Sequence, residues 1–131
     1  MNLKYKTVAV DFDGTLTYGD NYPKVKDINI WAVIALIAYK RAGGTLLLFT
    51  CRTDFALEEA LRECSKYGLY FDEVNRTTQK AIDKWREKHP HSSISSKVSA
   101  DLYIDDKAYP NNITGIDWTL LSRELLKEEG A

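Results

Sequence analysis

Two pairs of aspartates stand directly after apolar segments of this chain. Asp11 and Asp13 follow a valine-rich segment, and Asp105 and Asp106 follow a second apolar one. Residues two positions apart on an extended chain lean towards the same side, so Asp11 and Asp13 can share one site. Asp105 and Asp106 would join them if the two segments are neighbouring strands. Carboxylates crowded in this way repel one another strongly unless a cation neutralises them.

The predicted cation is Mg²⁺, which prefers hard oxygen ligands, uses few protein donors and takes an oxygen of a substrate phosphate. A bound cation neutralises the phosphate, which otherwise repels an attacking carboxylate. Thr50 follows another apolar segment and provides a hydroxyl donor for a phosphoryl oxygen. These residue types therefore favour phosphate chemistry with Mg²⁺ as the cofactor.

The elements that must position these residues follow from the alternation of apolar segments, helical patterns and turn residues. Strands are expected at residues 7–12, 45–50, 70–74 and 101–104, with a short fifth strand at 116–118. Helices are expected from Asp27 to about Ala42, from Asp54 to Gly68, from Thr77 or Thr78 towards His89, and over residues 120–129. Strands that alternate with helices form a parallel sheet covered on both faces, and its ligands bind beyond the carboxyl ends of the strands. We therefore expect an α/β fold, a three-layer α/β/α sandwich around a central parallel sheet, as a single domain over residues 1–131.

The same residues resemble the motifs of the haloacid dehalogenase-like phosphohydrolases, in the same order along the chain. The segment Asp-Phe-Asp-Gly-Thr-Leu-Thr, which begins at Asp11, resembles the first motif, and Thr50 after Leu-Leu-Leu-Phe resembles the second. Lys97, in Lys-Val-Ser-Ala-Asp-Leu-Tyr-Ile-Asp-Asp, resembles the third motif, and the two aspartates that end this segment resemble the fourth. The resemblance covers residues 8–109. The stretch 97–107 is especially similar to small bacterial and phage members, some of which are associated with capsule or sugar-phosphate metabolism.

The resemblance implies a Rossmann-like core and separate roles for the first two aspartates. Asp11 would be the nucleophile and also a Mg²⁺ ligand. Asp13 would protonate the leaving oxygen and then activate the water that hydrolyses the intermediate, and its backbone carbonyl would bind the metal. Family members that cleave carbon–halogen bonds lack this second aspartate, so Asp13 favours phosphate chemistry.

The resemblance also implies roles for the later motifs. Thr50 and Lys97 would hold the phosphoryl oxygens. Asp105 would bind Mg²⁺, directly or through water, and Asp106 would support it at the metal site.

Arg52 and Gly14 are the candidate substrate-binding residues. Arg52 stands two positions after the predicted hydroxyl donor, so it is placed to reach a phosphate or a substrate hydroxyl, and a salt bridge at the start of the helix is the alternative. For Lys97 the alternative is a surface lysine in a polar loop. For Asp106 the alternative is a solvated cap.

The expected function is hydrolysis of a small phosphomonoester, a sugar phosphate or a nucleotide, through a phosphoaspartate. A polynucleotide or protein phosphatase of the same superfamily is the alternative among enzymes, and a phosphate-binding or receiver-like signalling domain is the alternative outside them. The intervals from Asp13 to Thr50 and from Thr50 to Lys97 leave no room for a folded cap domain, which needs about 40 to 50 residues. We therefore expect a capless site that is open to solvent or roofed by a neighbouring subunit of a homo-oligomer.

The charge and composition narrow the expected partners. The chain has 18 basic and 19 acidic side chains, so nothing general attracts it to nucleic acid or to an anionic membrane surface. Its most apolar run, residues 30–38, is too short to span a bilayer. Cys51 and Cys64 are too few and too loosely spaced for a disulfide framework or a zinc site, which favours a reducing, cytoplasmic compartment. A small phosphorylated substrate is the expected partner.

Overall fold

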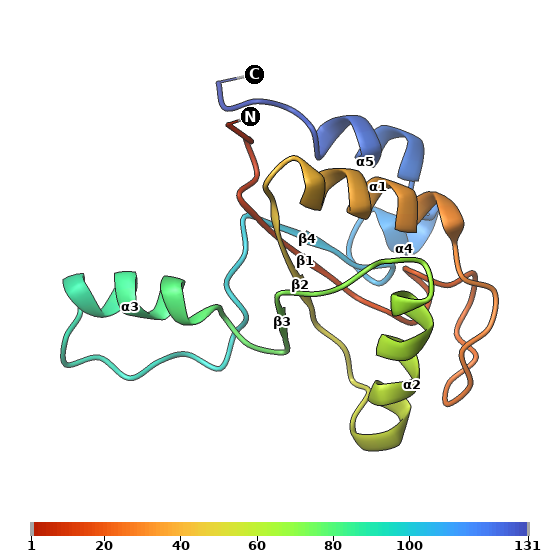
Figure 1. Ribbon diagram of the computed structural model, residues 1–131, viewed down its shortest axis with the longest axis horizontal. Coiled ribbons are helices and arrows are strands. Elements are labelled where there is room, and N and C mark those ends of the chain that lie inside the picture. The colour runs from red at the N-terminus through yellow and green to blue at the C-terminus, as the bar shows by residue number, and fades with distance from the viewer. Residues whose placement is uncertain (1, 131) are drawn as a thin grey trace.

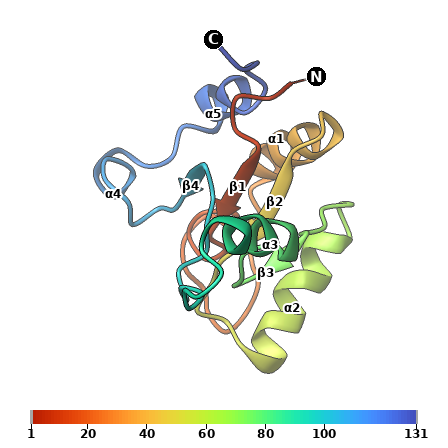
Figure 2. The same ribbon diagram turned by 90° about the vertical axis from the view of Figure 1, so that its left-hand side faces the viewer.

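The structure is a computed structural model that describes residues 2–130. In chain order its elements are β1 (Thr7–Val10), α1 (Ile30–Arg41), β2 (Thr45–Leu48), α2 (Asp54–Ser65), β3 (Glu73–Val74), α3 (Gln79–Lys88), β4 (Leu102–Ile104), α4 (Asn111–Thr114) and α5 (Trp118–Glu124). The strands form one sheet in the order β3-β2-β1-β4, and every pair in it is parallel. Figures 1 and 2 show β4, β1 and β2 side by side at the centre of the molecule. The expected α/β fold with a central parallel sheet is confirmed.

One apolar core holds the sheet to its helices. Val8 and Val10 of β1 stand in register with Leu46 and Leu48 of β2, and all four side chains are completely buried. Because strand side chains alternate between the two faces, these residues share one face. Side chains of α1, α2 and α5 belong to the same core, and α1 packs directly on β2 and α5. The core therefore supports the strands whose carboxyl ends carry the predicted aspartates.

Asp27 and Asp54 are the caps that the sequence predicts for the first two helices, but the structure shows other residues in these positions. The side chain of Asn29, not that of Asp27, accepts hydrogen bonds from the first backbone N–H groups of α1. Asp27 has a positive φ of 53° and lies outside the helix. Thr53 is the N-cap of α2, so Asp54 is its first residue rather than its cap. Thr78 caps α3, which is one of the two positions expected from the sequence.

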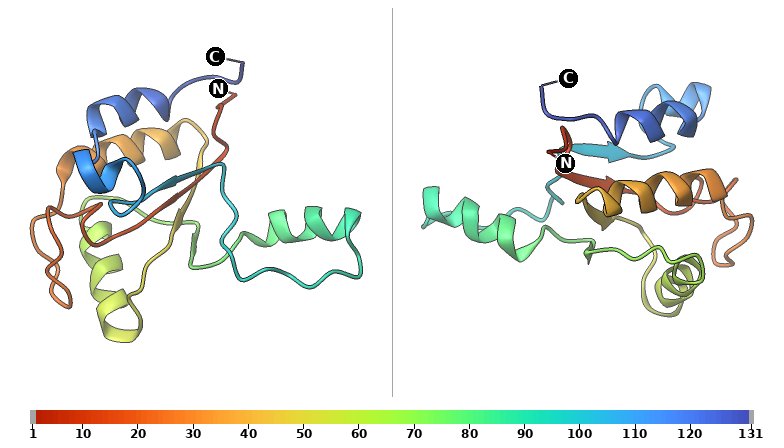
Figure 3. Two further views of the ribbon diagram at one scale, coloured as in Figure 1. Left: turned by 180° about the vertical axis from the view of Figure 1, so that it is seen from behind. Right: turned by 45° about the horizontal axis from the view of Figure 1, so that its top comes forward.

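α3 stands away from the sheet instead of lying flat on it. In Figures 1 and 3 the helix projects to one side of the molecule, and the chain then returns along residues 89–101 to the start of β4. None of the residues of α3 is buried. Its apolar side, with Ile82 and Trp85, faces the returning segment across a pocket. We call α3 and the returning segment, residues 79–99, the α3 arm.

The C-terminal part corrects two expectations. Residues 116–118 do not form a fifth strand: Asp117 caps α5 through a hydrogen bond from Leu120 N–H, and the helix begins at Trp118. The closing helix therefore spans 118–124 rather than 120–129. Trp118 is buried against the core, and this packing overrides the β-like pattern of the local sequence. Among residues 2–130, no helix is long and apolar enough to cross a membrane.

Candidate functional site

The carboxyl ends of β1, β2 and β4 border one cavity of about 440 Å³. Most of the predicted site residues line it: Asp11, Asp13, Thr50, Arg52, Asp105 and Asp106. Residues far apart in sequence meet there because parallel strands end at the same edge of the sheet. Asp11 stands one position beyond β1, and its N–H donates to the Ile104 carbonyl at the end of β4 at 3.0 Å. The sheet itself therefore joins the first and the fourth motif.

Three carboxylates form the centre of this cavity. Oxygen atoms of Asp11, Asp105 and Asp106 all lie within 4.8 Å of one another. Burial raises the pKa of Asp11 from its ordinary value of 3.8 to about 7, and the neighbouring carboxylates of Asp105 and Asp106 add to this shift. A donor set made only of carboxylate oxygens fits a hard divalent cation, which would also remove the repulsion between them. We call these three residues the acidic cluster.

Thr15 links two members of the acidic cluster, and the sequence assigned it no role. Its hydroxyl oxygen accepts the N–H of Asp106 at 3.0 Å and lies 3.3 Å from Oδ2 of Asp11. The side chain is almost completely buried. The signal that could have indicated this role is its position four residues after Asp11, within the first motif.

Gly14 lies behind the acidic cluster rather than against a substrate. Its N–H donates to the hydroxyl of Thr17 at 3.0 Å, so it is not directed into the cavity. Its lack of a side chain gives the Asp106 carboxylate room to approach the backbone. The structure therefore gives Gly14 a packing role, and its expected contact with a substrate stays a prediction.

Thr50 is held at the edge of the cavity by Asn75, which follows β3. The Thr50 N–H donates to Oδ1 of Asn75 at 2.7 Å, and Nδ2 of Asn75 donates to the Thr50 carbonyl at 3.0 Å. The Thr50 hydroxyl accepts the N–H of Arg52 at 3.1 Å. Because that oxygen acts as an acceptor in this bond, its own hydrogen remains to be donated to a ligand.

Arg52 forms a bidentate salt bridge with Asp13. Its Nε donates to Oδ2 of Asp13 at 2.8 Å, and its Nη2 donates to Oδ1 at 2.7 Å. The remaining N–H groups donate to the backbone carbonyls of Pro23, Lys24 and Ala56. All five N–H groups of the guanidinium thus have protein acceptors. The structure shows the salt bridge that the sequence left as an alternative, and not a guanidinium with N–H groups free for a phosphate.

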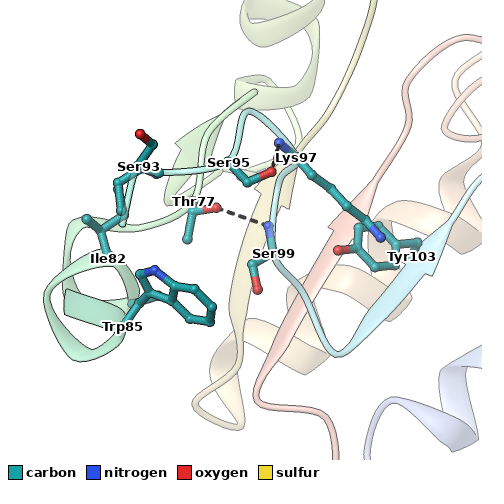
Figure 4. A pocket seen from close by; sticks show the side chains of 10 residues that line it. Thr77, Ile82, Trp85, Ser93, Ser95, Lys97, Ser99 and Tyr103 are labelled. Atoms are coloured by element: carbon teal, nitrogen blue, oxygen red, sulfur yellow. Dashed lines mark hydrogen bonds between the residues drawn. The ribbon is translucent and has the colours of Figure 1, made fainter. Parts of the chain in front are cut away.

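Lys97 lies outside the cavity that holds the acidic cluster. It lines a separate pocket on the α3 arm, together with Ile82 and Trp85. Figure 4 shows its side chain extended along Tyr103, with its ammonium 5.7 Å from the centre of that ring. The lysine that lines the cavity is Lys107, whose ammonium is 3.8 Å from Oδ2 of Asp106. Its place directly after the paired aspartates was the available signal in the sequence.

Comparisons with known proteins found similar solved structures. No family model matches it, and no curated protein matches it. A hypothetical protein from Xanthomonas campestris aligns at 23% identity over 68% of this chain and 50% of its own, with a TM-score of 0.43. A conserved protein from Bacteroides thetaiotaomicron is 30% identical over 94% of this chain and 88% of its own, with a TM-score of 0.72. The chain therefore belongs to the same family as this conserved Bacteroides thetaiotaomicron protein.

Proposed function

We propose that the chain is a Mg²⁺-dependent phosphatase that hydrolyses a small phosphomonoester through a phosphoaspartate on Asp11. The observation that carries the proposal is the meeting of Asp11 with Asp105 and Asp106 at the ends of two adjacent parallel strands. Thr50 and Asp13 line the same cavity. These are the groups that transfer of a phosphoryl group to a carboxylate requires, and they come from three separate parts of the sequence.

The acidic cluster would hold the cation. Asp11, Asp105 and Asp106 offer oxygen ligands, and the resemblance in sequence adds the backbone carbonyl of Asp13. When bound, Mg²⁺ supplies the positive charge that neutralises both these carboxylates and the substrate phosphate. The raised pKa of Asp11 supports this assignment, because it reflects a buried and crowded carboxylate whose negative charge a cation would stabilise.

The chain's own groups would then act in two steps. In the first, a carboxylate oxygen of Asp11 attacks phosphorus. The bond from phosphorus to the leaving oxygen breaks, its electron pair stays on that oxygen, and Asp13 gives the oxygen a proton. In the second, Asp13 takes a proton from water as the water oxygen attacks phosphorus, and the Asp11 carboxylate leaves to release inorganic phosphate. Each oxygen of Asp13 has a second lone pair beyond its bond to Arg52, so one of them can carry the proton that Asp13 gives in the first step and recovers from water in the second.

Positive and donor groups around the phosphate would come from Thr50 and Lys107. Thr50 would donate its hydroxyl hydrogen to a phosphoryl oxygen, as the sequence motif implies. Lys107 lines the cavity, whereas Lys97 does not, so its placement supports Lys107 as the source of positive charge. Hydrogen-bond donors and positive charges beside the phosphoryl oxygens stabilise the transition state of phosphoryl transfer.

The cavity favours a small substrate over a polymer end. Its volume of about 440 Å³ lies in the ordinary range of small-molecule sites. Asp20 adds a further carboxylate to the cavity wall, and this would repel a polyanion such as a nucleic-acid end. A sugar phosphate or a nucleotide is therefore the proposed substrate class. The proposed location of the enzyme is the cytoplasm.

The test is hydrolysis of p-nitrophenyl phosphate with Mg²⁺ and with EDTA. The wild-type protein should be active only with Mg²⁺, and Asp11→Asn should be inactive because the nearly isosteric amide is a poor nucleophile. Asp83→Asn is the matched control, because this exposed aspartate lies on the α3 arm, and it should behave as wild type. Wild-type activity in EDTA, or undiminished activity of Asp11→Asn, would contradict the proposal.

A second assay addresses the substrate class. Sugar phosphates and nucleotides should be hydrolysed with higher kcat/KM than a 3′-phosphorylated oligonucleotide or a phosphoprotein. Faster hydrolysis of the oligonucleotide than of any small phosphomonoester would instead indicate a polynucleotide phosphatase.

A further inference from the structure

Arg52 joins three segments around the cavity through one buried side chain. The side chain is 1% exposed, and its five N–H groups reach three different parts of the chain. Asp13 follows β1, Pro23 and Lys24 lie in the loop between β1 and α1, and Ala56 lies in the first turn of α2. A planar guanidinium with five fixed donors is suited to this arrangement, whereas an ammonium is not.

Two aromatic rings hold the guanidinium in place. Its central carbon is 5.0 Å from the centre of the Phe12 ring and 5.2 Å from that of Tyr22. Tyr22 also lines the cavity, next to the residues whose carbonyls Arg52 binds. The loop that forms one wall of the cavity is therefore attached to the same group that binds Asp13.

This attachment sets the direction of the Asp13 carboxylate. Both of its oxygens are bound to Arg52, and the carboxylate stands outside the acidic cluster although Asp11 is only two residues away. It remains 17% exposed, at the edge of the cavity. Among residues 2–130, Arg52 is the only hydrogen-bond partner of this carboxylate, so no other hydrogen bond would hold it in this place.

We propose that Arg52 is a positioning residue that holds the Asp13 carboxylate beside the acidic cluster and ties its position to the cavity wall at residues 22–24. The inference rests on the proposed function for its kinetic consequence, and on the contacts alone for its structural consequence. Arg52 would touch no reacting atom in the proposed reaction. It acts through Asp13, whose proton transfer to the leaving oxygen needs a carboxyl group at a defined place.

The kinetic test compares leaving groups in Arg52→Lys and wild type. An alkyl phosphate has a poor leaving group that depends on a proton from Asp13, whereas p-nitrophenolate leaves with little help. Because kcat/KM reports the step that forms the phosphoaspartate, Arg52→Lys should lose up to about 10²-fold for the alkyl phosphate and much less for the aryl phosphate. Arg62→Lys, an exposed arginine of α2 bound to Glu59, is the control and should match wild type on both substrates. An equal loss on both substrates, or no loss on either, would overturn the positioning role.

The structural test needs no enzymatic activity. Trypsin cleaves after Lys24 and Lys26, which lie in the loop between β1 and α1 that includes the cavity wall. Cleavage there should accelerate when this loop loses its attachment to Arg52. Arg52→Lys removes the bidentate donor, whereas Asp13→Asn retains Arg52 and weakens its acceptor. If one of these variants fails to fold, the other still tests the attachment. Asp105→Asn is the matched control, because it removes a carboxylate of the same cavity that does not bind Arg52. Cleavage after Lys24 no faster in Asp13→Asn than in Asp105→Asn would sink the proposal.

The two tests separate the failure of this inference from that of the proposed function. If wild-type protein hydrolyses no phosphomonoester, the proposed function fails while the trypsin comparison still decides the role of Arg52. If the wild type is active and the variants show neither effect, only the positioning role is lost.

Discussion

The carboxylate of Asp106, after β4, packs directly against the backbone of Gly14 in the turn after β1. A Cβ atom on Gly14 would overlap with Oδ2 of Asp106, and Gly14 also has a φ of +79°. Glycine is therefore required there both for the backbone conformation and for the approach of a member of the acidic cluster.

Gly14→Ala should consequently weaken both the fold and the binding of a cation. We expect a loss of about 1 to 3 kcal/mol in the free energy of unfolding, measured by urea denaturation, and weaker Mg²⁺ activation. Gly19→Ala is the matched control, because Gly19 has nearly the same φ, +78°, and no atom lies within 4 Å of its Cβ position. If both variants showed the same Mg²⁺ dependence, the contact with Asp106 would have no functional role.

Thr15→Val should disturb the acidic cluster by removing the hydroxyl that contacts Asp11 and Asp106. Valine has nearly the shape of threonine but leaves the Asp106 N–H without its acceptor at a nearly buried position. We expect the free energy of unfolding to fall by about 1 to 3 kcal/mol and the Mg²⁺ requirement to rise. Thr15→Ser retains the hydroxyl and should restore the Mg²⁺ requirement. Identical behaviour of the valine and serine variants would contradict the role of the hydroxyl.

The stability of the metal-free protein should depend on pH through Asp11. Its pKa is raised from 3.8 to about 7, mainly by burial, so the folded protein keeps a proton in this range that the unfolded chain has lost. Because the folded state binds more protons, the free energy of unfolding should fall as pH rises from about 4 to 7. Asp11→Asn removes this effect and should be more stable than wild type at about pH 8, by on the order of 2 kcal/mol. Thermal unfolding in EDTA at about pH 4 and pH 8 measures it, and a variant less stable than wild type at the higher pH would contradict it.

Alanine variants of Lys107 and Lys97 should differ in their effect on kcat/KM. Lys107 lines the cavity with an exposed ammonium, so Lys107→Ala should lower kcat/KM modestly, by about two- to fivefold. Lys97 lies in the pocket of the α3 arm, so Lys97→Ala should change kcat/KM little. A large loss in Lys97→Ala alone would support the sequence motif over its placement in the structure. Raising the salt concentration should reduce the effect of Lys107→Ala, because exposed charges are screened.

The sequence alone was sufficient to locate the acidic residues of the site. Short apolar segments bounded by turn residues predict buried strands, and the carboxyl ends of parallel strands meet at one edge of a sheet. These two rules put Asp11 and Asp105 at the same edge of the sheet, and the pairing of β1 with β4 in the folded chain makes them neighbours. Thr50 at the edge of the same cavity followed in the same way.

The tertiary structure decided the contacts that depend on direction through space. Arg52 and Asp13 are 39 positions apart, and whether the guanidinium points to that carboxylate or to a ligand is not encoded in the local pattern of either segment. The path of the α3 arm likewise carries Lys97 to Tyr103 and away from the acidic cluster. Local spacing indicates where a strand lies, because strand side chains alternate along the chain, although β1 and β2 end at Val10 and Leu48, two residues before the expected ends. The partner of a long side chain depends on the packing of segments distant in sequence, which only the folded chain brings together.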